Sequence, residues 1–556
     1  MCKIETSVNA PRARGGHNSR NMNTTLIALL YVFRHGQRPP YPPPFAESWA
    51  DAAQFWTNRS RGFADEFSPA AWNMSAAAFS RQELAPAGAK LLRHLGEHAA
   101  LQARPLVGDA TDLCALPAML LSDGSVRDEQ SAAAFASGFF PARCLAQRQR
   151  AIVVANESSS FYAATSDDAD NGCVAVPDEA DVEHGFGSTA ALTDLYSRQL
   201  RRIGGVLGCC APVLCAKYGL PATERCTLDQ LPYTFTGVYY EGLYRGALSA
   251  GAAFARAWML RALAGFGSSL GWGELSTEEV RELYAVHSRV LWLGSGLNRS
   301  VASGSHLLAF LLATLEQVAR GEELDGAAPG APRLLALFAH DFNLLYLRRL
   351  LAASWLTPSW PFDVAPTGAS VSFELHSVPA AAEETGDGSY RVVGVLTAAS
   401  VEQQSTAAPL VPPHAPPGRS VFFDGTLAEF RQAALAALDT RCVRQPLRQT
   451  VEALQPNEPS PPRPWSAVLY SARAVGLAIV LLLAGAAFGY LTGRATHASR
   501  LLRGQPLLLP SVRQELEACA QGRLAAGEGC RQHVGVPAVP STDAPTQGSA
   551  SGSAAS

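Results

Sequence analysis

The stretch LIALLYVFRHGQRPP, residues 26–40, decides the fold prediction for this chain. Its first eight residues form a continuous apolar run, which is typical of a strand buried on both faces of a parallel sheet. The run ends at Arg34 and passes into a turn stiffened by Gly36, Pro39 and Pro40. Open α/β sheets bind their ligands beyond the carboxyl ends of their strands, so this turn is a candidate binding loop.

A second apolar run, residues 334–339, repeats the pattern and ends at His340 and Asp341. We predict that it is another buried strand of the same sheet. Both polar clusters then lie just past a strand end and face one crevice.

The segments between and after these two runs have a different character. Apolar residues at helical spacing predict a mostly helical insertion with helices over residues 194–217, 239–266, 277–293 and 303–320. Residues 358–375 return to short strands, and residues 370–375 alternate as a half-buried strand does. Residues 421–438 close the globular part. The predicted fold class is therefore α/β, a parallel-sheet core with a helical insertion.

Composition excludes some classes of function. The chain has 556 residues, 47% of them hydrophobic and 17% charged, and a net charge of −3. It is long and apolar enough for more than one domain. Lys and Arg do not gather into blocks that would neutralise a nucleic-acid backbone, so we expect no nucleic-acid partner.

An uncharged apolar run near the end predicts a transmembrane helix. It covers residues 474–493 between Arg473 and Arg494, about the 20 residues needed to cross a bilayer. A buried core helix is the alternative, but several prolines precede the run and a polar tail follows it. We predict a proline-rich spacer over residues 444–466, the membrane helix over 467–493 and a largely disordered tail over 494–556.

Glycosylation sequons and cysteines favour a lumenal or extracellular large domain. The sequons all precede the predicted membrane helix, at Asn23, Asn58, Asn73, Asn156 and Asn298. So does an even-numbered set of cysteines, which suits an oxidising compartment: Cys114, Cys144, Cys173, Cys209, Cys210, Cys215, Cys226 and Cys442. Zinc is disfavoured because none of them forms a CxxC pair.

The beginning of the chain does not fit this topology. Residues 1–23, expected to be an N-terminal extension, lack the apolar core of a signal peptide. Either the start lies upstream or the topology differs.

The candidate loop carries two arginines around one histidine. Arg34 and Arg38 can bracket the oxygens of a phosphate while the imidazole of His35 faces the phosphorus. An Arg-rich surface turn would be the ordinary interpretation. The second cluster changes the balance, because His340 can donate to the same phosphate and Asp341 can protonate a leaving alcohol. Arg127, at a predicted helix start, is a third candidate cation.

These motifs resemble a known family. Residues 34–40 are similar to the RHGxRxP signature of the histidine acid phosphatases, the branch of the histidine phosphatase superfamily that includes acid phosphatases and phytases. The similarity extends through Arg127 with its following Ser131 and Ala132. It continues into residues 340–344, 366–370 and 373–375, and spans roughly residues 24–443.

The resemblance implies a phosphoglycerate-mutase-like fold and a role for each motif residue. His35 would be the nucleophile that forms a phosphohistidine, and Asp341 the proton donor. The phosphate would be bound by Arg34, Arg38, Arg127 and His340. No metal or other cofactor is expected.

The resemblance also implies a set of disulfides. The expected pairs are Cys114 with Cys144, Cys215 with Cys226, and Cys173 with Cys442. Adjacent cysteines rarely bridge each other, so Cys209 and Cys210 stay unassigned, one of them free or paired between chains.

The implied division places the catalytic domain in residues 24–150 and 330–443 and the insertion in 151–329. With the membrane helix, the chain resembles the type I membrane-bound acid phosphatases of protozoa. We therefore expect a single-pass protein of the endosomal or lysosomal system or the cell surface. Its expected partners are phosphomonoester small molecules or phosphoproteins, with a homodimer left open.

Two alternatives remain. A phytase or inositol-polyphosphate phosphatase would need extra basic side chains, and no such cluster is evident in the insertion. A non-catalytic membrane receptor on the same fold is less favoured, because a binder has no need of a proton donor.

Overall fold

The computed structural model describes residues 24–57, 63–108, 112–154, 173, 189–221, 226–235, 244–379 and 390–455. The predicted N-terminal extension, membrane helix and tail lie outside these residues, as do the sequons at Asn23, Asn58 and Asn156. Asn73 and Asn298 are described, and both are exposed.

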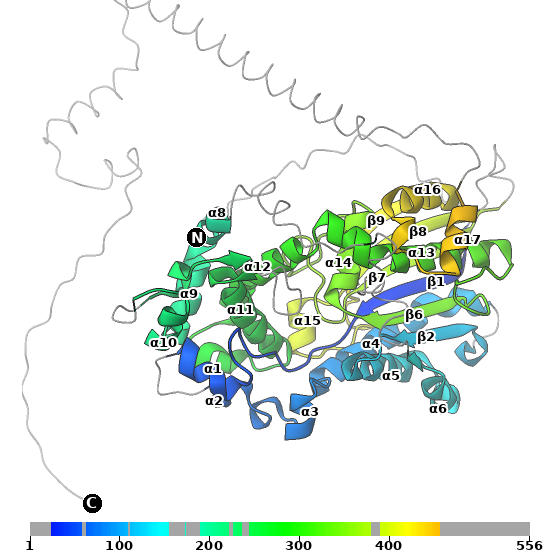
Figure 1. Cartoon of the computed structure of the whole chain (residues 1–556). Helices are drawn as coiled ribbons and strands as arrows, with labels where there is room; N and C mark the ends of the chain where they lie inside the picture. The colour runs from blue at the N-terminus through cyan, green and yellow to red at the C-terminus, as the bar shows by residue number, and fades with distance from the viewer. Residues whose placement is uncertain are drawn as a thin grey trace, which may run out of the picture. The chain divides into compact units, whose positions relative to one another are not determined.

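A seven-stranded sheet forms the centre of the fold (Figure 1), with the strand order β3-β2-β6-β1-β7-β8-β9. The strands are β1 (Thr25–Arg34), β2 (Ala118–Ser122), β3 (Val153–Val154), β6 (Leu334–Ala339), β7 (Ser370–Ser377), β8 (Tyr390–Ala398) and β9 (Gly418–Thr426). The first four in this order are parallel, as predicted. The last three run antiparallel to their neighbours, so the sheet is mixed rather than purely parallel.

Alternate residues of β1 enter two different cores. Leu29, Tyr31 and Phe33 pack against the helices of one face, α4 (Pro86–Ala103) and α5 (Val126–Phe139). Leu30 and Val32 pack against the other. The helices of that second face are α13 (Leu297–Arg320), α14 (Asp341–Leu350), α16 (Leu427–Ala437) and α17 (Leu447–Ala453). The continuous apolar run thus reflects burial on both faces of a central strand.

A second group of helices lies beside the sheet (Figure 1) around its own apolar cluster. Its members are α1 (Trp49–Trp56), α2 (Ala64–Phe67), α8 (Thr189–Leu195), α9 (Ser197–Leu207), α10 (Pro212–Lys217), α11 (Ala247–Leu263) and α12 (Thr277–Gly294). Residues 194–217, predicted to be helical, hold the end of α8 and the whole of α9 and α10. Gly208 ends α9 in the left-handed conformation and so separates it from α10.

The remaining elements are short. They are α3 (Ala76–Ser80), α6 (Ala142–Arg150), α15 (Val401–Ser405), the pair β4 (Thr234–Phe235) and β5 (Tyr244–Arg245), and the 3-10 helices η1 (Ala70–Trp72), η2 (Arg104–Val107), η3 (Leu113–Ala115), η5 (Leu228–Gln230), η6 (Gly267–Gly273) and η8 (Thr440–Cys442).

The division into layers differs from the predicted boundaries. Helix α13 lies inside the predicted insertion but packs in the sheet core, whereas α1 and α2 precede the insertion and pack with its helices. Helix α17 falls in the predicted spacer, yet Leu447 and Val451 are buried in the sheet core. Burial against neighbours decides these assignments, and helical periodicity alone does not reveal which neighbour a helix covers.

Among the described residues, one helix is long and apolar enough to cross a membrane, and it is α13. Within its most apolar window, 89% of the residues are buried inside the fold. Helix α13 is thus a core helix, and its composition is weak evidence for a membrane span.

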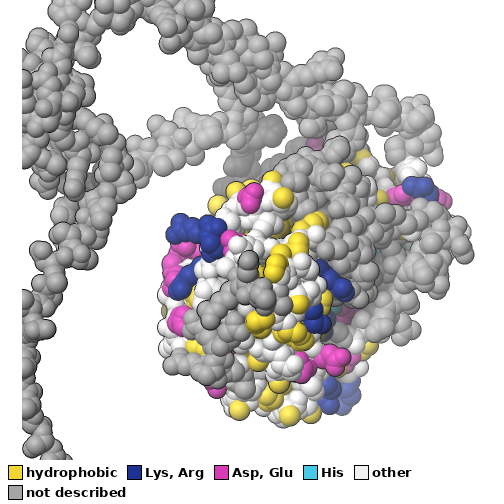
Figure 2. Space-filling model, turned by 60° about the vertical axis from the view of Figure 1, so that its left-hand side comes forward, with side chains coloured by type: hydrophobic (Ala, Val, Ile, Leu, Met, Phe, Trp, Pro, Cys, Tyr) yellow, Lys and Arg dark blue, Asp and Glu magenta, His cyan; other side chains and the backbone are white. Residues whose placement is uncertain are grey.

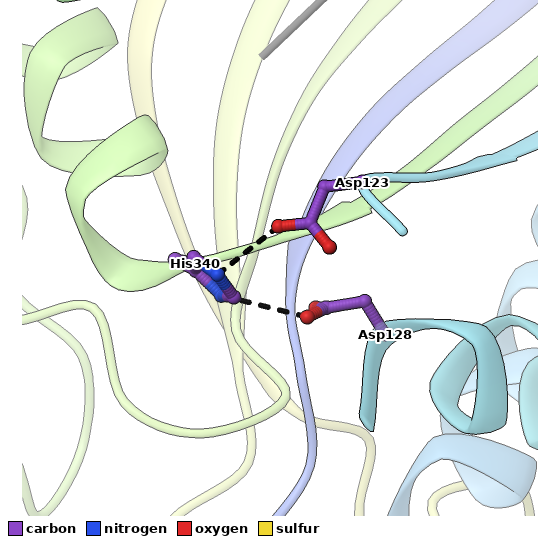
Figure 3. A group of neighbouring side chains, drawn as sticks. All are labelled: Asp123, Asp128 and His340. Carbon is purple, nitrogen blue, oxygen red and sulfur yellow. Dashed lines mark ion pairs between the residues drawn. The ribbon is translucent and has the colours of Figure 1, made fainter. Parts of the chain in front are cut away.

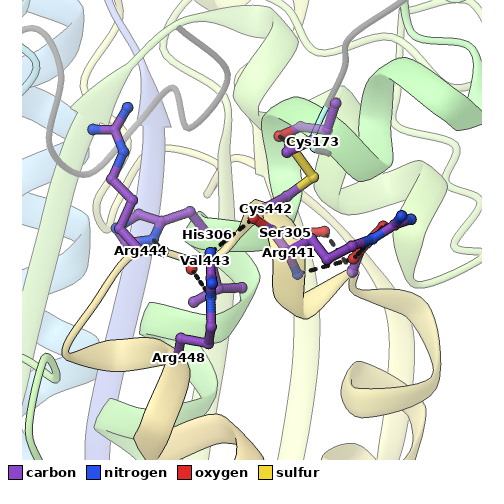
Figure 4. Close-up of a disulfide and its surroundings, with 10 residues drawn as sticks. Cys173, Ser305, His306, Arg441, Cys442, Val443, Arg444 and Arg448 are labelled. Carbon is purple, nitrogen blue, oxygen red and sulfur yellow. Dashed lines mark hydrogen bonds and ion pairs between the residues drawn. A yellow bond between two sulfur atoms is a disulfide. The ribbon is translucent and has the colours of Figure 1, made fainter. Parts of the chain in front are cut away.

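Four disulfides join the described cysteines. Three are the pairs that the resemblance implies, Cys114–Cys144, Cys173–Cys442 and Cys215–Cys226. Figure 4 shows Cys173 bound to Cys442 beside α13, where Ser305 and His306 accept hydrogen bonds from the backbone of the same C-terminal segment. The fourth pair is Cys209–Cys210, so the expectation of a free or interchain cysteine here is wrong.

Gly88 brings α4 against the loop that follows β1. A Cβ atom on Gly88 would lie 2.3 Å from the backbone oxygen of Gln37 and 2.6 Å from its nitrogen. We predict that Gly88→Ala lowers the free energy of unfolding by about 1–3 kcal/mol, because backbone must shift to admit the methyl group.

Gly205→Ala is the matched control for Gly88→Ala. Gly205 also lies within a helix, α9, and a Cβ there would meet nothing within 4 Å. This substitution should be neutral or stabilising by about 0.5–1 kcal/mol. Urea denaturation of both variants checks the pair, and equal stabilities would contradict the close approach.

Candidate active site

The site is built where β1 and β6 end side by side. The two strands are parallel, and their register pairs Arg34 with Ala339. His35 and His340 are therefore neighbours, with ring centroids 5.5 Å apart. The convergence predicted from the two apolar runs is present in the structure.

Backbone hydrogen bonds hold the loop after β1 in place. The amide of His35 donates to Ala339 O at 2.9 Å, and the amide of Gly368 donates to His35 O at 3.0 Å. The amide of Gly36 donates to the hydroxyl of Ser131 on α5 at 3.3 Å. The loop is thus fixed by β6, by α5 and by the turn that precedes β7.

Gln37 and Gln404 link this loop to α15. The side-chain nitrogen Nε2 of Gln37 donates to Gln404 Oε1 at 2.6 Å, and the hydroxyl of Thr367 donates to the same oxygen at 2.9 Å. The motif at residues 366–370 therefore supports the loop rather than reaching the crevice itself.

His35 is buried with one nitrogen already engaged. Its Nδ1 lies 2.8 Å from Gly36 O, and a carbonyl oxygen can only accept, so Nδ1 carries the proton. Burial, followed by Arg38 and Arg127, holds the pKa of His35 well below its ordinary value. The imidazole is neutral, and Nε2 keeps a lone pair for attack.

Arg34 and Asp341 form a buried ion pair across the two strand ends. Arg34 Nη2 lies 3.0 Å from Asp341 Oδ2, and Arg34 Nη1 donates to Ala365 O at 2.6 Å. Burial alone would raise the pKa of Asp341. Arg34, His287 and His340 outweigh burial and lower it, so the carboxyl is ionised when the site holds no other anion.

Arg127, at the first turn of α5, reaches the same centre. Its Nη2 lies 3.0 Å from His340 Nε2. Two carboxylates also face His340 (Figure 3): Asp123 at 3.0 Å and Asp128 at 3.5 Å. Burial alone would lower the pKa of His340, but Asp128 and Asp123 raise it above its ordinary value.

The helices beside the sheet also contribute side chains. Arg256 on α11 acts electrostatically on Arg34, Arg38 and Asp341, and its guanidinium lies 5.7 Å from the ring of Tyr41. Among the described residues, Arg256 Nε has no hydrogen-bond partner. Arg256 is one basic residue that the helical part adds to the site, and the sequence alone did not single it out.

Arg38 also lies close to the ring of Tyr41. Its guanidinium lies 4.0 Å from the centre of the Tyr41 ring and donates to Gln82 Oε1 at 2.6 Å. Burial and the nearby Arg256 and Arg127 lower the pKa of Arg38, although Tyr41 opposes them. All six residues predicted for the site therefore converge, and five of them are arginine or histidine around one aspartate.

Sequence reasoning missed Asp123, Asp128 and Arg256. Asp123 could have been found, because it follows β2 directly and β2 pairs with β6 in parallel. The strand has only five residues, and no strand was predicted there. Asp128 and Arg256 lie on helices, where only the packing shows that they face the site.

Asp123, Asp128 and His340 are close enough to raise the question of a metal. They offer ligand atoms within 4.8 Å of one another. Asp128 and Asp123 raise the pKa of His340, however, so protons compete with a metal ion for the nitrogens of this ring. Arg127 adds a further positive charge beside it. We retain the prediction of a reaction without metal.

The charges outside the site do not form a second anion surface on the face shown in Figure 2. On its described part, basic and acidic side chains lie side by side among uncharged ones. In the helical part, Arg201 pairs with Asp229 and Arg202 with Glu279.

Comparison with known proteins places this geometry in a known fold. No family model matches the chain, and no curated relative matches it. Among solved structures, a phytase from Klebsiella sp. ASR1 is 19% identical with a TM-score of 0.55, covering 76% of this chain and 97% of its own. The phytase from Citrobacter braakii is 17% identical with a TM-score of 0.59, covering 76% and 100%.

A phytase from Hafnia alvei, solved in complex with tartrate, is 18% identical with a TM-score of 0.57, covering 76% of this chain and 99% of its own. These phytases belong to the histidine acid phosphatase family. The described part of the chain therefore has the histidine acid phosphatase fold.

Proposed function

We propose that the chain is a histidine acid phosphatase that hydrolyses phosphomonoesters through a phosphohistidine on His35. The observation that carries this proposal is the convergence of a neutral, buried His35 with Arg34, Arg38, Arg127 and His340 at the ends of β1 and β6. A neutral imidazole beside several cations suits attack on a dianionic phosphorus centre.

In the first step, the lone pair of His35 Nε2 attacks phosphorus and the bond from phosphorus to the ester oxygen breaks. Arg34, Arg38, Arg127 and His340 hold the phosphoryl oxygens, whose charge they stabilise. The alcohol leaves with a proton from Asp341. In the second step, water attacks the phosphohistidine and gives a proton back to Asp341, and phosphate and neutral His35 are released.

The Arg34–Asp341 pair explains how a carboxyl with a lowered pKa can donate a proton. A phosphate that binds Arg34 competes with Asp341 for the guanidinium and places negative charge beside the carboxyl. Both effects raise the pKa of Asp341 in the complex. The bound substrate thus converts an ion-paired carboxylate into a general acid.

The nucleophile is tested by His35→Ala. We expect kcat for a simple phosphomonoester to fall by roughly a thousandfold or more, as for the removal of other nucleophiles. The control is His376→Ala, a half-buried histidine on β7 that pairs with Leu26 near the start of β1, at the opposite end of that strand from Arg34. Full activity of His35→Ala, or loss of wild-type activity to a chelator, would contradict the mechanism.

The proton donor is tested by Asp341→Asn with two esters. General acid catalysis contributes about 10²–10⁴-fold when the leaving group is a poor one. An alkyl phosphate should therefore lose about that much in kcat, whereas an aryl phosphate with an acidic phenol should lose far less. Equal losses for both esters would show that Asp341 acts in another way.

A phytase is the second candidate, and Arg256 is the observation that favours it. Arg256 adds a cation from the helices beside the sheet, and its guanidinium lies 5.7 Å from the centre of the Tyr41 ring. A substrate with several phosphates would use such a group for a phosphate that is not cleaved. The solved structures of similar fold are phytases, which is consistent with this candidate.

Phytate and a simple phosphomonoester, assayed side by side, separate the two candidates. If phytate is the better substrate, Arg256→Ala should raise its KM about tenfold, the equivalent of one charge-assisted hydrogen bond, while the KM of the simple ester changes little. Arg202→Ala, an exposed arginine of the same helical part, is the control. An unchanged KM for phytate would remove Arg256 from substrate binding.

We further propose a single-pass membrane protein with a glycosylated, lumenal or extracellular catalytic part. The four disulfides and the exposed Asn73 and Asn298 support an oxidising, glycosylating compartment. Glycosidase treatment of the full chain from a eukaryotic host checks this topology. A chain without glycans would count against it.

A further inference from the structure

Asp128 is a buried carboxylate that faces two of the groups assigned to phosphate. It lies in the first turn of α5 with no exposed surface. Its Oδ2 is 3.5 Å from His340 Nδ1 and 3.7 Å from Arg127 Nε, and the Ser125 hydroxyl donates to the same oxygen. Among the described residues, its other oxygen, Oδ1, has no hydrogen-bond partner.

His340 does not depend on Asp128 alone for a counter-ion. Asp123 lies closer, with its carboxylate 3.0 Å from His340 Nε2. The backbone amide of Ser125 donates a hydrogen bond to this carboxylate and holds it in place after β2. The cluster in Figure 3 together with Arg127 thus contains two cations and two carboxylates. With Asp128 ionised these charges cancel, whereas with Asp128 protonated one positive charge remains for an incoming anion.

We propose that Asp128 is a positioning residue that couples anion binding at Arg127 and His340 to the uptake of one proton. A neutral Asp128 leaves both cations available to a phosphate. An ionised Asp128 occupies them and repels the anion. The inference rests on the proposed function, because it takes Arg127 and His340 as phosphate ligands.

The surroundings of Asp128 place its uptake of a proton near neutral pH. Burial raises the pKa of Asp128 to about 7, and the charge of Asp123 adds to that rise, whereas His340 and Arg127 oppose it. Besides these groups from β2, α14 and α5, Arg34 at the end of β1 also acts on Asp128. Asp123 itself stays ionised, since hydrogen bonds and His340 lower its pKa despite burial.

A different role for Asp128 would change anion affinity in the opposite direction when the carboxylate is removed. If the carboxylate served only to keep His340 protonated, its removal would lower the pKa of His340 and weaken anion binding at neutral pH. If it competes with the anion, its removal strengthens anion binding there. The pH dependence of affinity therefore separates the two roles.

The test uses sulfate as a competitive inhibitor, because its charge does not change between about pH 5 and pH 9. In the wild-type protein, the inhibition constant should rise about tenfold between pH 6 and pH 8, the span of one proton with a pKa of about 7. In Asp128→Asn this rise should disappear. In Ser125→Ala, which removes a hydrogen bond to the ionised form, it should move to higher pH.

Glu129→Gln is the matched control, since it removes one carboxylate from the same helical turn and should behave as the wild type. The proposal would be overturned if the sulfate inhibition constant of Asp128→Asn still rose with pH, or began to rise at lower pH than in the wild type. It would also be overturned if the wild-type inhibition constant did not change with pH. Ser125→Ala decides the case if Asp128→Asn fails to fold.

Calorimetric titration with sulfate keeps this test independent of catalysis. If the wild-type protein hydrolyses no phosphomonoester, the proposed function fails, yet sulfate binding still reports whether Asp128 takes up a proton. If hydrolysis depends on His35 and the sulfate profile is flat, only the role of Asp128 fails.

Discussion

Arg34 and Asp341 form a buried ion pair between the ends of β1 and β6, and the geometry of the site follows from it. The pair joins residues more than 300 positions apart, at the edge where the parallel register brings the two strands together. A buried ion pair is costly to desolvate and is weak evidence for stability. The value that we propose for it is chemical, because an anion that competes for Arg34 weakens the hold of the guanidinium on the carboxyl.

The same logic extends to the rest of the crevice. Each cation that we assign to phosphate has a resident partner: Arg38 a glutamine oxygen, Arg127 and His340 two carboxylates. The carboxylates offset part of the positive charge, which limits the repulsion that several buried cations would otherwise create. Substrate binding exchanges these partners for phosphoryl oxygens and, through Asp341 and Asp128, changes where protons reside.

The helices beside the sheet complete the crevice rather than simply enlarging the protein. Helix α12 places Tyr284 and His287 near Arg34 and Asp341, and burial with Arg256 holds the pKa of His287 well below its ordinary value. His287 therefore contributes no proton of its own near neutral pH. Arg256, from α11, is the cation that we propose to distinguish substrates by charges remote from the phosphate that is cleaved.

The sequence was informative where the physics is local. The apolar run before Arg34 and the run before His340 are strands because each is buried on both faces, and the polar residues after them meet because parallel strands end at one edge. The sequence did not show which elements pack against one another. Nothing in the periodicity of α13 says that it covers the sheet, and nothing around Arg256 or Asp128 says that their helices turn these side chains toward the site. The Cys209–Cys210 pair went against the expectation for adjacent cysteines.

The central claim is that His35 carries the phosphoryl group during turnover. It is tested most directly by mixing the protein with a phosphomonoester, quenching within milliseconds into alkaline denaturant, which preserves phosphohistidine, and mapping the modified peptide by mass spectrometry. The account predicts one phosphoryl group on the peptide that contains His35, and none on that peptide in the His35→Ala protein. Turnover without any phosphorylated peptide, or a phosphoryl group on another residue, would contradict it.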